Sequence, residues 1–154
     1  MYKRQGYAVA KFKNIKADGT AGTHVDFTDI DFPLFRLGEQ YLIYAEAALR
    51  GGSGGSLVTA DSYINLLRTR AAAATIVQSD LTLPFILDER ARELYWEGHR
   101  RTDLIRFGKY TDATYLWPWK GGIKAGKAVE SWRNVYPIPS DELVSNPNLT
   151  QNPN

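Results

Sequence analysis

The stretch LPFILDERARELYWEGHRRTDLIRF, residues 83–107, decides the fold of this chain. On a helix, Leu87, Ala91, Leu94 and Tyr95 recur at the spacing of one apolar face that can be buried in a core. The opposite face carries acid–base pairs three or four residues apart: Asp88 with Arg92, Glu89 with Arg92, Glu97 with Arg100, and Arg100 with Asp103. Their density, together with a glycine at position 98 that would let another backbone approach, indicates that some of these charges are buried. The sequence therefore predicts one scaffold helix over 83–107, clamped by ion pairs.

Composition narrows the class of protein. A chain of 154 residues with 44% hydrophobic and 23% charged residues is expected to form one globular domain, 1–154. The net charge is only +2 and the basic residues are mixed with acids, which argues against a nucleic-acid partner. The absence of cysteine excludes disulfides and thiolate metal sites. No signal peptide and no run of 18 apolar residues is present.

Two weaker patterns lie near the N-terminus. Tyr7, Val9 and Lys11 alternate with small or apolar residues, which is a weak strand signal. Further on, three aspartates resemble a loose set of calcium ligands, at positions 26, 29 and 31. The glycine and the terminal glutamate of an EF-hand loop are missing, so we expect an acidic loop and no metal site.

Residues 34–71 are predicted to form a helical hairpin. The first helix, from Leu34 to Arg50, buries an apolar face made by Leu34, Leu37, Tyr41, Tyr44, Ala45 and Ala48. It stops at Gly51, at the start of a flexible GGSGGS loop. A second helix follows with Thr59 as N-cap, and its buried face contains Ala60, Tyr63, Ile64, Leu67 and Ala71. Such a hairpin is the unit of tetratricopeptide-type solenoids, whose exposed faces need neighbours. Either the long third helix covers this hairpin, or part of the natural chain is absent.

Residues 110–154 change character. Aromatic residues stand among glycines and lysines without a helical period: Tyr110, Tyr115, Trp117, Trp119, Trp132 and Tyr136. Prolines and asparagines then predict a turn-rich tail. The fold expected overall is mostly α: a hairpin, a long helix, and an irregular aromatic-rich loop and tail.

Catalytic interpretations of the charged residues are weak. A glycosidase needs a pair of carboxylates, and Glu89, Glu93 and Glu97 stand one helical turn apart. Each has an arginine within three or four residues, however, which lowers a carboxylate pKa instead of raising it toward that of a general acid. His99 has no histidine at metal-ligand spacing, and the glycine-rich loop lacks the lysine of a phosphate-binding loop. We therefore expect no catalytic residue, no metal and no cofactor.

The aromatic loop is the best candidate for a binding site. Sugars stack their C–H faces on aromatic rings and need polar neighbours for their hydroxyls. The candidate substrate-binding residues are Trp117, Trp119, Tyr115 and Trp132, with Lys120, Lys124, Arg133 and Asn134 as polar neighbours. The alternative is that the rings only pack the loop onto the helices. That alternative stays open for Trp117 and Trp119, and it is favoured for Trp132 and Tyr136.

Four motifs, in order, resemble the C-terminal part of the RagB/SusD family of nutrient-uptake lipoproteins. FRLGEQYLIYAEAALRGG resembles the family's R-x-x-E-x-x-L-x-x-A-E-A helix, through Arg36, Glu39, Leu42, Ala45, Glu46 and Ala47. YINLLRTRA resembles I-N-x-(I/L/V)-R-x-R-A, through Ile64, Asn65, Leu67, Arg68, Arg70 and Ala71. ERARELYWEGHRRTDLIRFGKY is similar to the signature E-R-x-x-E-(L/F)-x-x-E-G-x-R-x-x-D-L-x-R, through Glu89, Arg90, Glu93, Leu94, Glu97, Gly98, Arg100, Asp103, Leu104 and Arg106. The end of the chain resembles P-I-P-x-x-E-(I/L) followed by N-P-x-L-x-Q-N, through Pro137, Ile138, Pro139, Glu142, Leu143, Asn146, Pro147, Leu149, Gln151 and Asn152. One departure is Arg101-Thr102, where the family usually has bulkier apolar or aromatic residues.

This resemblance implies tetratricopeptide-like helix pairs on the outer face of a Gram-negative outer membrane. It implies non-catalytic capture of oligosaccharides or other nutrients for a SusC-like TonB-dependent transporter. The membrane would be reached only through a lipidated N-terminal cysteine that this chain lacks, so we expect a C-terminal fragment or a truncated member. The family's glycan site draws heavily on segments outside this region. The alternative function is a helix-repeat module that binds a partner protein and has no glycan site of its own.

Overall fold

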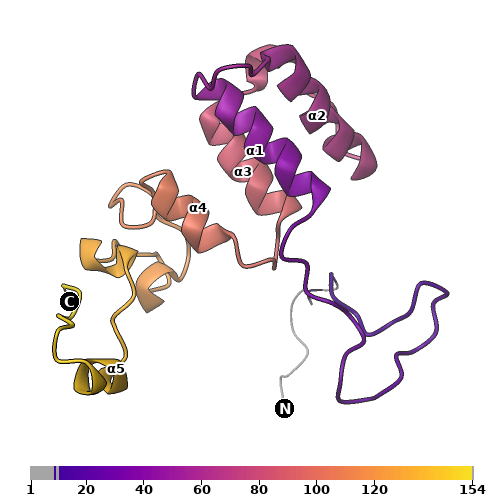
Figure 1. The fold of residues 1–154 in the computed structure, drawn as a ribbon. Coiled ribbons are helices and arrows are strands. Elements are labelled where there is room, and N and C mark those ends of the chain that lie inside the picture. The colour runs from indigo at the N-terminus through magenta and orange to yellow at the C-terminus, as the bar shows by residue number, and fades with distance from the viewer. Residues whose placement is uncertain (1–8, 10, 154) are drawn as a thin grey trace.

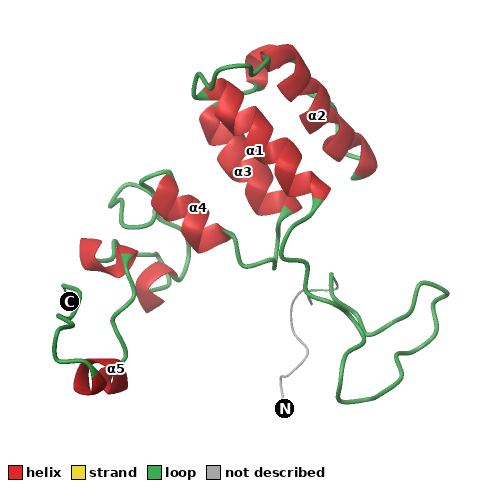
Figure 2. Cartoon of the chain, viewed as in Figure 1, coloured by secondary structure: helices red, strands yellow, loops and turns green. Residues whose placement is uncertain are grey.

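The structure is a computed structural model that describes residue 9 and residues 11–153. The described residues form helices and loops, with no strand beyond an isolated bridge between Ile15 and Ala21 (Figures 1 and 2). The α-helices are α1 (Leu37–Leu49), α2 (Leu57–Arg70), α3 (Leu83–Glu93), α4 (Arg100–Arg106) and α5 (Ser140–Ser145). Short 3₁₀ turns are η1 (Gln78–Asp80), η2 (Lys120–Gly122) and η3 (Ser131–Asn134). The expectation of a mostly α fold is confirmed. Of the weak strand pattern, Tyr7 lies outside the described residues, and Val9 and Lys11 form no strand.

The core lies between α1, α2 and α3. α1 packs against both other helices, and α1 and α2 form the predicted hairpin (Figure 1). The buried apolar side chains of this core cluster are Leu42, Ala45, Ala60, Ile64, Leu67, Leu81, Ile86 and Leu94. Burying a leucine or isoleucine side chain contributes roughly 2 kcal/mol, so this cluster supplies the main driving force for the hairpin and α3 to associate.

The first helix begins three residues later than predicted, at Leu37. Arg36 before it is extended, with φ −148° and ψ 157°, and its guanidinium donates to the carboxylates of Glu93 and Glu97. Because this ion pairing fixes the entry of the chain, Leu34 and Leu37 are turned outward and are 73% and 64% exposed. The prediction that these two leucines belong to the buried face is wrong.

The hairpin loop contains the residue that ends α1, a glycine, and the residue that caps the start of α2, a serine. Gly51 has φ 81°, the left-handed conformation that follows a helix, and its N–H donates to Ala48 O. The N-cap of α2 is Ser56 and not Thr59, because the Ser56 hydroxyl accepts a hydrogen bond from the Thr59 N–H at 3.3 Å. The Tyr44 hydroxyl accepts from the Ser56 N–H at 3.0 Å, which ties the loop back to α1.

The predicted helix over 83–107 is two helices. α3 starts at the expected N-cap, Thr82, but ends at Glu93, and Trp96 (φ 62°) and Gly98 (φ 80°) are both left-handed. The Glu93 carbonyl accepts from the Arg36 guanidinium at 2.6 Å and from the Lys11 ammonium at 3.1 Å. In a longer helix, this carbonyl would accept from a backbone N–H of the next turn. Here the side chains of Arg36 and Lys11 donate to it instead, so the helix ends at Glu93. No atom lies within 4 Å of the place where a Gly98 Cβ would be. The glycine is therefore needed for its backbone conformation, and the predicted close approach of another backbone is wrong.

Ion pairs between the first three family motifs hold α3 and α4 to the hairpin of α1 and α2. Arg68 binds Glu89 and Arg70 binds Glu93, which join α2 to α3; Arg90 lies near Glu39 and binds Asp103; Arg106 binds Glu46 and Asp103. The predicted pair of Glu89 with Arg92 forms at 2.5 Å. The predicted pairs of Arg100 with Glu97 and Asp103 do not form, because the break between α3 and α4 turns Glu97 toward Arg36 and Lys11.

The tail is closed on itself by side-chain amides. The Gln151 carboxamide accepts from the Ile138 N–H at 2.8 Å and donates to the Ile138 carbonyl at 2.9 Å. Asn152 donates to the Tyr136 carbonyl at 2.7 Å. Arg101 joins this tail to α4, because its guanidinium donates to Arg133 O at 2.7 Å and lies 4.0 Å from the Tyr136 ring. The departure from the family pattern at position 101 thus has a structural role.

Candidate functional site

The three glutamates of the signature are not arranged for acid catalysis. Glu89 and Glu97 are buried, and each accepts hydrogen bonds from basic side chains: Glu89 from Arg68 and Arg92, and Glu97 from Arg36 and Lys11. Burial alone would raise the pKa of Glu97, but the hydrogen bonds from Arg36 and Lys11 outweigh it and lower the pKa below its ordinary value. A general acid needs a raised pKa, so this cluster fits a structural role.

The aromatic loop brings two of the predicted residues together. The rings of Tyr115 and Trp117 meet edge to face, with centroids 5.7 Å apart and planes at 69°. The Tyr115 hydroxyl accepts a hydrogen bond from the Arg100 guanidinium at 2.8 Å, and Arg100 also donates to Leu87 O in α3 at 2.8 Å. The ring pair is therefore attached to the helical core through one arginine. A hollow of about 370 Å³ lies beside it, lined by Arg100, Leu104, Tyr115, Leu116 and Trp117.

Trp119 is held outside this pair by a tight turn. The Lys120 N–H donates to Trp117 O at 3.1 Å, which closes a four-residue turn with Pro118 and Trp119 at its centre. Trp119 has φ 70° and ψ 2°, the values of the third residue of a type II turn, where glycine is the favoured residue. Its side chain is 65% exposed. A large aromatic ring is thus presented to solvent at a position that costs backbone strain, which is a pattern found at functional sites.

Lys120 does not serve as the predicted exposed neighbour. Its side chain is only 4% exposed, and its ammonium donates to Tyr115 O at 2.7 Å and to Asp112 O at 3.3 Å. The same ammonium lies 4.5 Å from the centre of the Trp117 ring. Lys120 therefore supports the loop from within, and it is unavailable to a ligand hydroxyl.

The other predicted polar neighbours differ in what they offer. Lys124 is exposed on the far arm of the loop, and its carbonyl accepts from the Trp119 N–H at 3.4 Å. Arg133 is bound to Glu130 at 2.8 Å, and Asn134 is half-buried with a long contact to Thr111. Lys124 is the neighbour that remains best placed to meet a ligand beside Trp119.

Asp112 fixes the start of the loop. Its carboxylate accepts from the hydroxyl and the N–H of Thr114, both at 2.7 Å, and from Lys109 at 3.0 Å. These contacts, led by the Thr114 hydroxyl, hold the pKa of Asp112 well below its ordinary value. The carboxylate therefore stays ionised and keeps the turn at 112–114 closed.

Trp132 lies apart from the other three candidates. It is in η3, half-buried, and the Arg133 guanidinium stacks 4.4 Å from its ring centre. Among the described residues no ring contact joins it to Tyr115, Trp117 or Trp119. The structure thus places Trp132 in the segment that leads to the tail, apart from the other candidate rings.

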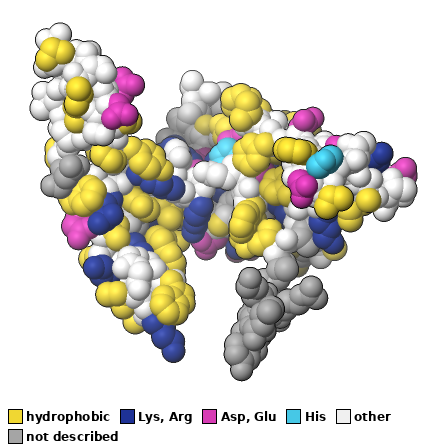
Figure 3. Space-filling model, turned by 90° about the horizontal axis from the view of Figure 1, so that it is seen from below, with side chains coloured by type: hydrophobic (Ala, Val, Ile, Leu, Met, Phe, Trp, Pro, Cys, Tyr) yellow, Lys and Arg dark blue, Asp and Glu magenta, His cyan; other side chains and the backbone are white. Residues whose placement is uncertain are grey.

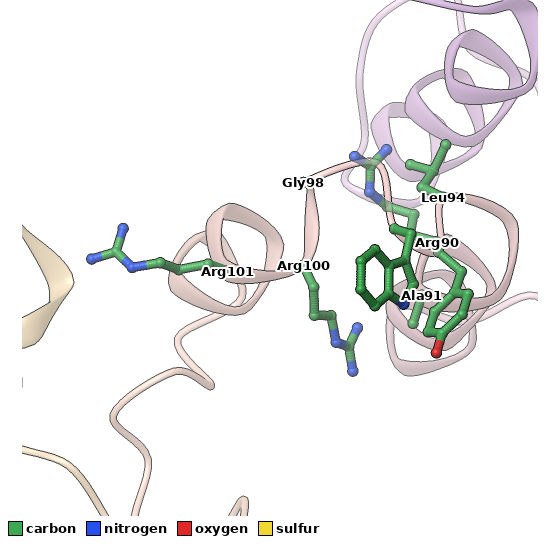
Figure 4. A pocket seen from close by; sticks show the side chains of 8 residues that line it. Arg90, Ala91, Leu94, Gly98, Arg100 and Arg101 are labelled. Atoms are coloured by element: carbon green, nitrogen blue, oxygen red, sulfur yellow. The ribbon is translucent and has the colours of Figure 1, made fainter. Parts of the chain in front are cut away.

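A second aromatic surface was missed by sequence reasoning. Tyr95 and Trp96, in the segment between α3 and α4, are 54% and 60% exposed and border a hollow of about 500 Å³. In Figure 4, Arg90 points from α3 toward α1, whereas Arg100 and Arg101 extend away from each other on the other side of Gly98. Tyr95 was placed on the core face because the helix was expected to continue; its end at Glu93 turns the ring outward. The glycine at 98 was the one available sign of this break.

Neither a metal site nor a membrane-crossing helix is found in the described part of the chain. No group of three or more His, Cys, Asp or Glu residues there could hold a metal ion. Of the three aspartates considered as calcium ligands, Asp29 instead binds the N–H and the hydroxyl of Thr23, at 2.7 and 2.6 Å. No described helix is long and apolar enough to cross a membrane.

A helix pair bound to a third helix by ion pairs, with an arginine-anchored aromatic loop, defines a tetratricopeptide-like helical protein that displays aromatic rings. The profile of the SusD family matches residues 1–154. The starch-binding protein SusD of Bacteroides thetaiotaomicron is 46% identical over 147 residues, which are 96% of this chain. The chain therefore belongs to the SusD family.

Solved structures agree with this assignment. A SusD superfamily protein from Bacteroides vulgatus is 32% identical, with a TM-score of 0.65 over 88% of this chain and 31% of its own. Surface glycan-binding protein A from Bacteroides thetaiotaomicron, solved also in complex with laminarihexaose, is 33% identical, with a TM-score of 0.67 over 81% of this chain and 25% of its own. The chain spans about a quarter of the length of SusD, 26%. SusD and surface glycan-binding protein A are named as binding proteins.

Proposed function

We propose that this chain takes part in the non-catalytic binding of oligosaccharides at the bacterial cell surface. Its relatives support this role, since one is named as a starch-binding protein and others as surface glycan-binding proteins. The ligand would then be delivered to a SusC-like TonB-dependent transporter in the outer membrane. Anchoring to that membrane would come from a lipidated N-terminus such as the family resemblance implies.

The observation that carries the proposal is the exposed indole of Trp119 at a left-handed position. Glycine would fit the turn with less strain, so the turn itself does not explain the tryptophan at this position. Its broad ring, 65% exposed, offers the flat apolar face on which a pyranose stacks.

The neighbouring residues have distinct roles in this proposal. Trp117 is half-buried, with Lys120 over its ring and Tyr115 at its edge, so it can offer a ligand only the part of its surface left uncovered. The Tyr115 hydroxyl is occupied by Arg100, and Tyr115 therefore shapes the hollow more than it donates to a ligand. On the face seen in Figure 3, basic side chains lie among hydrophobic ones, and such a surface suits a ligand with both C–H faces and hydroxyls.

Calorimetry with malto-oligosaccharides and laminari-oligosaccharides tests this site. We expect the double variant Trp117→Ala with Trp119→Ala to lose at least about tenfold in affinity, which corresponds to about 1.4 kcal/mol. Trp132→Ala is the matched control, since it removes a tryptophan of the same segment that lies apart from the ring pair, and it should bind within about twofold of the parent chain. Binding that survives the double change would refute the site.

A partner-protein function is the second candidate, favoured by one observation on the hairpin. α1 and α2 leave apolar side chains exposed, with Ile43 at 45%, Leu66 at 54% and Val58 at 70%. Such a surface can pack against another helix. The variant Val58→Glu with Leu66→Glu should then lose binding to the purified transporter, and the parent chain should bind no oligosaccharide, because this candidate has no glycan site of its own. A transporter that binds the variant as well as the parent chain would count against this candidate.

A further inference from the structure

Lys120 is an unusual side chain for the middle of a surface loop. Its ammonium is buried, yet no carboxylate of the described residues lies within ion-pairing distance of it, while nearly all the buried charges of the first three family motifs are paired. A buried cation without an anion is costly unless other groups solvate it. Here two backbone carbonyls and one indole face do so.

The three partners of the ammonium belong to one arm of the loop. Asp112 and Tyr115 offer carbonyls, and Trp117 offers its ring. The backbone of Lys120 continues the same connections, because its N–H binds Trp117 O at 3.1 Å and its carbonyl accepts from the Lys127 N–H at 3.0 Å. Lys120 is therefore the residue where the outgoing and returning arms of the loop are joined.

The orientation of both tryptophans depends on this joint. The ammonium covers part of the Trp117 ring, so turning the ring inward would remove one of the three groups that solvate the cation. The Lys120 side chain also points into the loop, which leaves Trp119, at the preceding position in a left-handed conformation, on the outside. Gly126 contributes by its small size, because a Cβ there would lie 2.4 Å from Trp117 O.

We propose that Lys120 is the positioning residue of the aromatic site: its buried ammonium organises residues 112–120 so that Trp117 and Trp119 are presented to an oligosaccharide. This inference rests on the proposed function for the identity of the ligand. The role of Lys120 in holding the loop can be tested without a ligand. Lys120 touches no ligand itself and acts through the two carbonyls and the Trp117 ring.

The test compares Lys120→Met with Lys124→Met. Methionine keeps an unbranched apolar stem, one atom shorter and with a sulfur in place of a methylene, and removes the ammonium. Lys124 is an exposed lysine of the same loop. In a chain whose Trp96, Trp119 and Trp132 are phenylalanine, acrylamide quenching of fluorescence reports on Trp117 alone. We expect Lys120→Met to raise the quenching constant about twofold or more, and Lys124→Met to leave it unchanged, because only the first change uncovers the ring.

Two more readouts separate positioning from general stability. With all tryptophans present, Lys120→Met should weaken oligosaccharide binding about tenfold while the urea midpoint followed by helical circular dichroism stays the same, since the helical core contains no contact to Lys120. An unchanged quenching constant, or a loss of helix stability that parallels it, would overturn the proposal. If the parent chain binds no oligosaccharide, the proposed function fails while quenching still decides the role of Lys120.

Discussion

The carboxamide of Asn65 and the backbone of Ile76 form a two-way hydrogen-bonded pair. Asn65 Nδ2 donates to Ile76 O at 3.1 Å, and Asn65 Oδ1 accepts from the Ile76 N–H at 2.8 Å. The pair pins the connection between α2 and α3 against α2, much as Gln151 pins the tail at Ile138. Asn65 and Gln151, each from a family motif, thus supply the hydrogen-bond partners that backbone groups in these irregular segments do not find in other backbone groups.

Asn65→Ala should therefore lower the free energy of unfolding by about 2 kcal/mol, because it leaves both backbone groups of half-buried Ile76 unpaired. Urea unfolding followed by circular dichroism measures the change. Asn148→Ala is the control, since the Asn148 side chain makes no hydrogen bond among the described residues, and it should have no measurable effect. Equal effects of the two changes would contradict the role assigned to Asn65.

Glu97→Ala should be more damaging, at about 3 kcal/mol. The Glu97 carboxylate is buried between Arg36 and Lys11, and removing it leaves the Lys11 ammonium without an anion and Arg36 with Glu93 alone. Glu130→Ala removes an exposed acid that is also paired with an arginine, and it should leave the urea midpoint unchanged. A comparable loss in both variants would mean that burial of the pair has no energetic weight.

Acid should weaken the chain through the same carboxylate. The folded-state pKa of Glu97 lies below the unfolded value of about 4.5, so the folded form binds its proton more weakly. The stabilisation is therefore complete above that unfolded value and is lost as the pH falls through the lower folded pKa. Urea midpoints measured from pH 7 downward should fall less steeply below pH 4.5 for Glu97→Gln than for the parent chain. Parallel pH profiles would show that other carboxylates dominate.

Gly98→Ala should cost about 1 kcal/mol although nothing would touch the new methyl group. The cost comes only from φ 80°, which disfavours a Cβ. Gly98→Asn should cost less than Gly98→Ala, because asparagine tolerates the left-handed conformation better than alanine does. Thermal unfolding of the three chains gives the order, and an alanine variant as stable as the parent would show that the break between α3 and α4 does not need this backbone angle.

Trp119→Gly should raise stability while it weakens oligosaccharide binding. Relief of the left-handed strain, about 1–2 kcal/mol, exceeds the roughly 0.5–1 kcal/mol of entropy that a glycine loses on folding. The net gain is about 0.5 kcal/mol. Trp119→Ala is the matched control, which should lose binding without the gain in stability. A glycine variant that binds as the parent does would assign the ring no functional role.

The helices could be predicted from periodicity, and local caps marked the stop at Gly51 and the start at Thr82, but the end of α3 could not be predicted. Ile64 and Leu67 lie in the core as expected because the apolar spacing of α2 is regular. The end of α3 depends on Arg36, 57 residues from Glu93 in sequence, whose guanidinium takes the last carbonyl. No local pattern reports such a contact. Gly98 was the one local sign, and its left-handed angle rather than its small size explains it.

The candidate loop could be found from its aromatic composition. Which of its side chains can contact a ligand depends on which are buried, and the composition does not show that. Trp119 and Lys120 are adjacent, and the sequence offers both as ligand contacts. The turn at 117–120 sends Trp119 outward and Lys120 inward, so one remains a contact and the other becomes a support. Tyr95 was misplaced for a related reason, because a regular helix was extended through a segment that has two left-handed residues.

The ion pairs between the first three family motifs restrict how this chain can be recombined with its relatives. The side chains of Arg36, Glu39 and Glu46 find their partners in residues 90–106, beyond the hairpin loop. A chimera with its crossover at 51–56 would join acids of one parent to guanidinium groups of another and keep the contacts only if both parents carry them at the same positions. A crossover after Gly108 keeps these pairs within a single parent, so the hairpin, α3 and α4 are inherited best as one block.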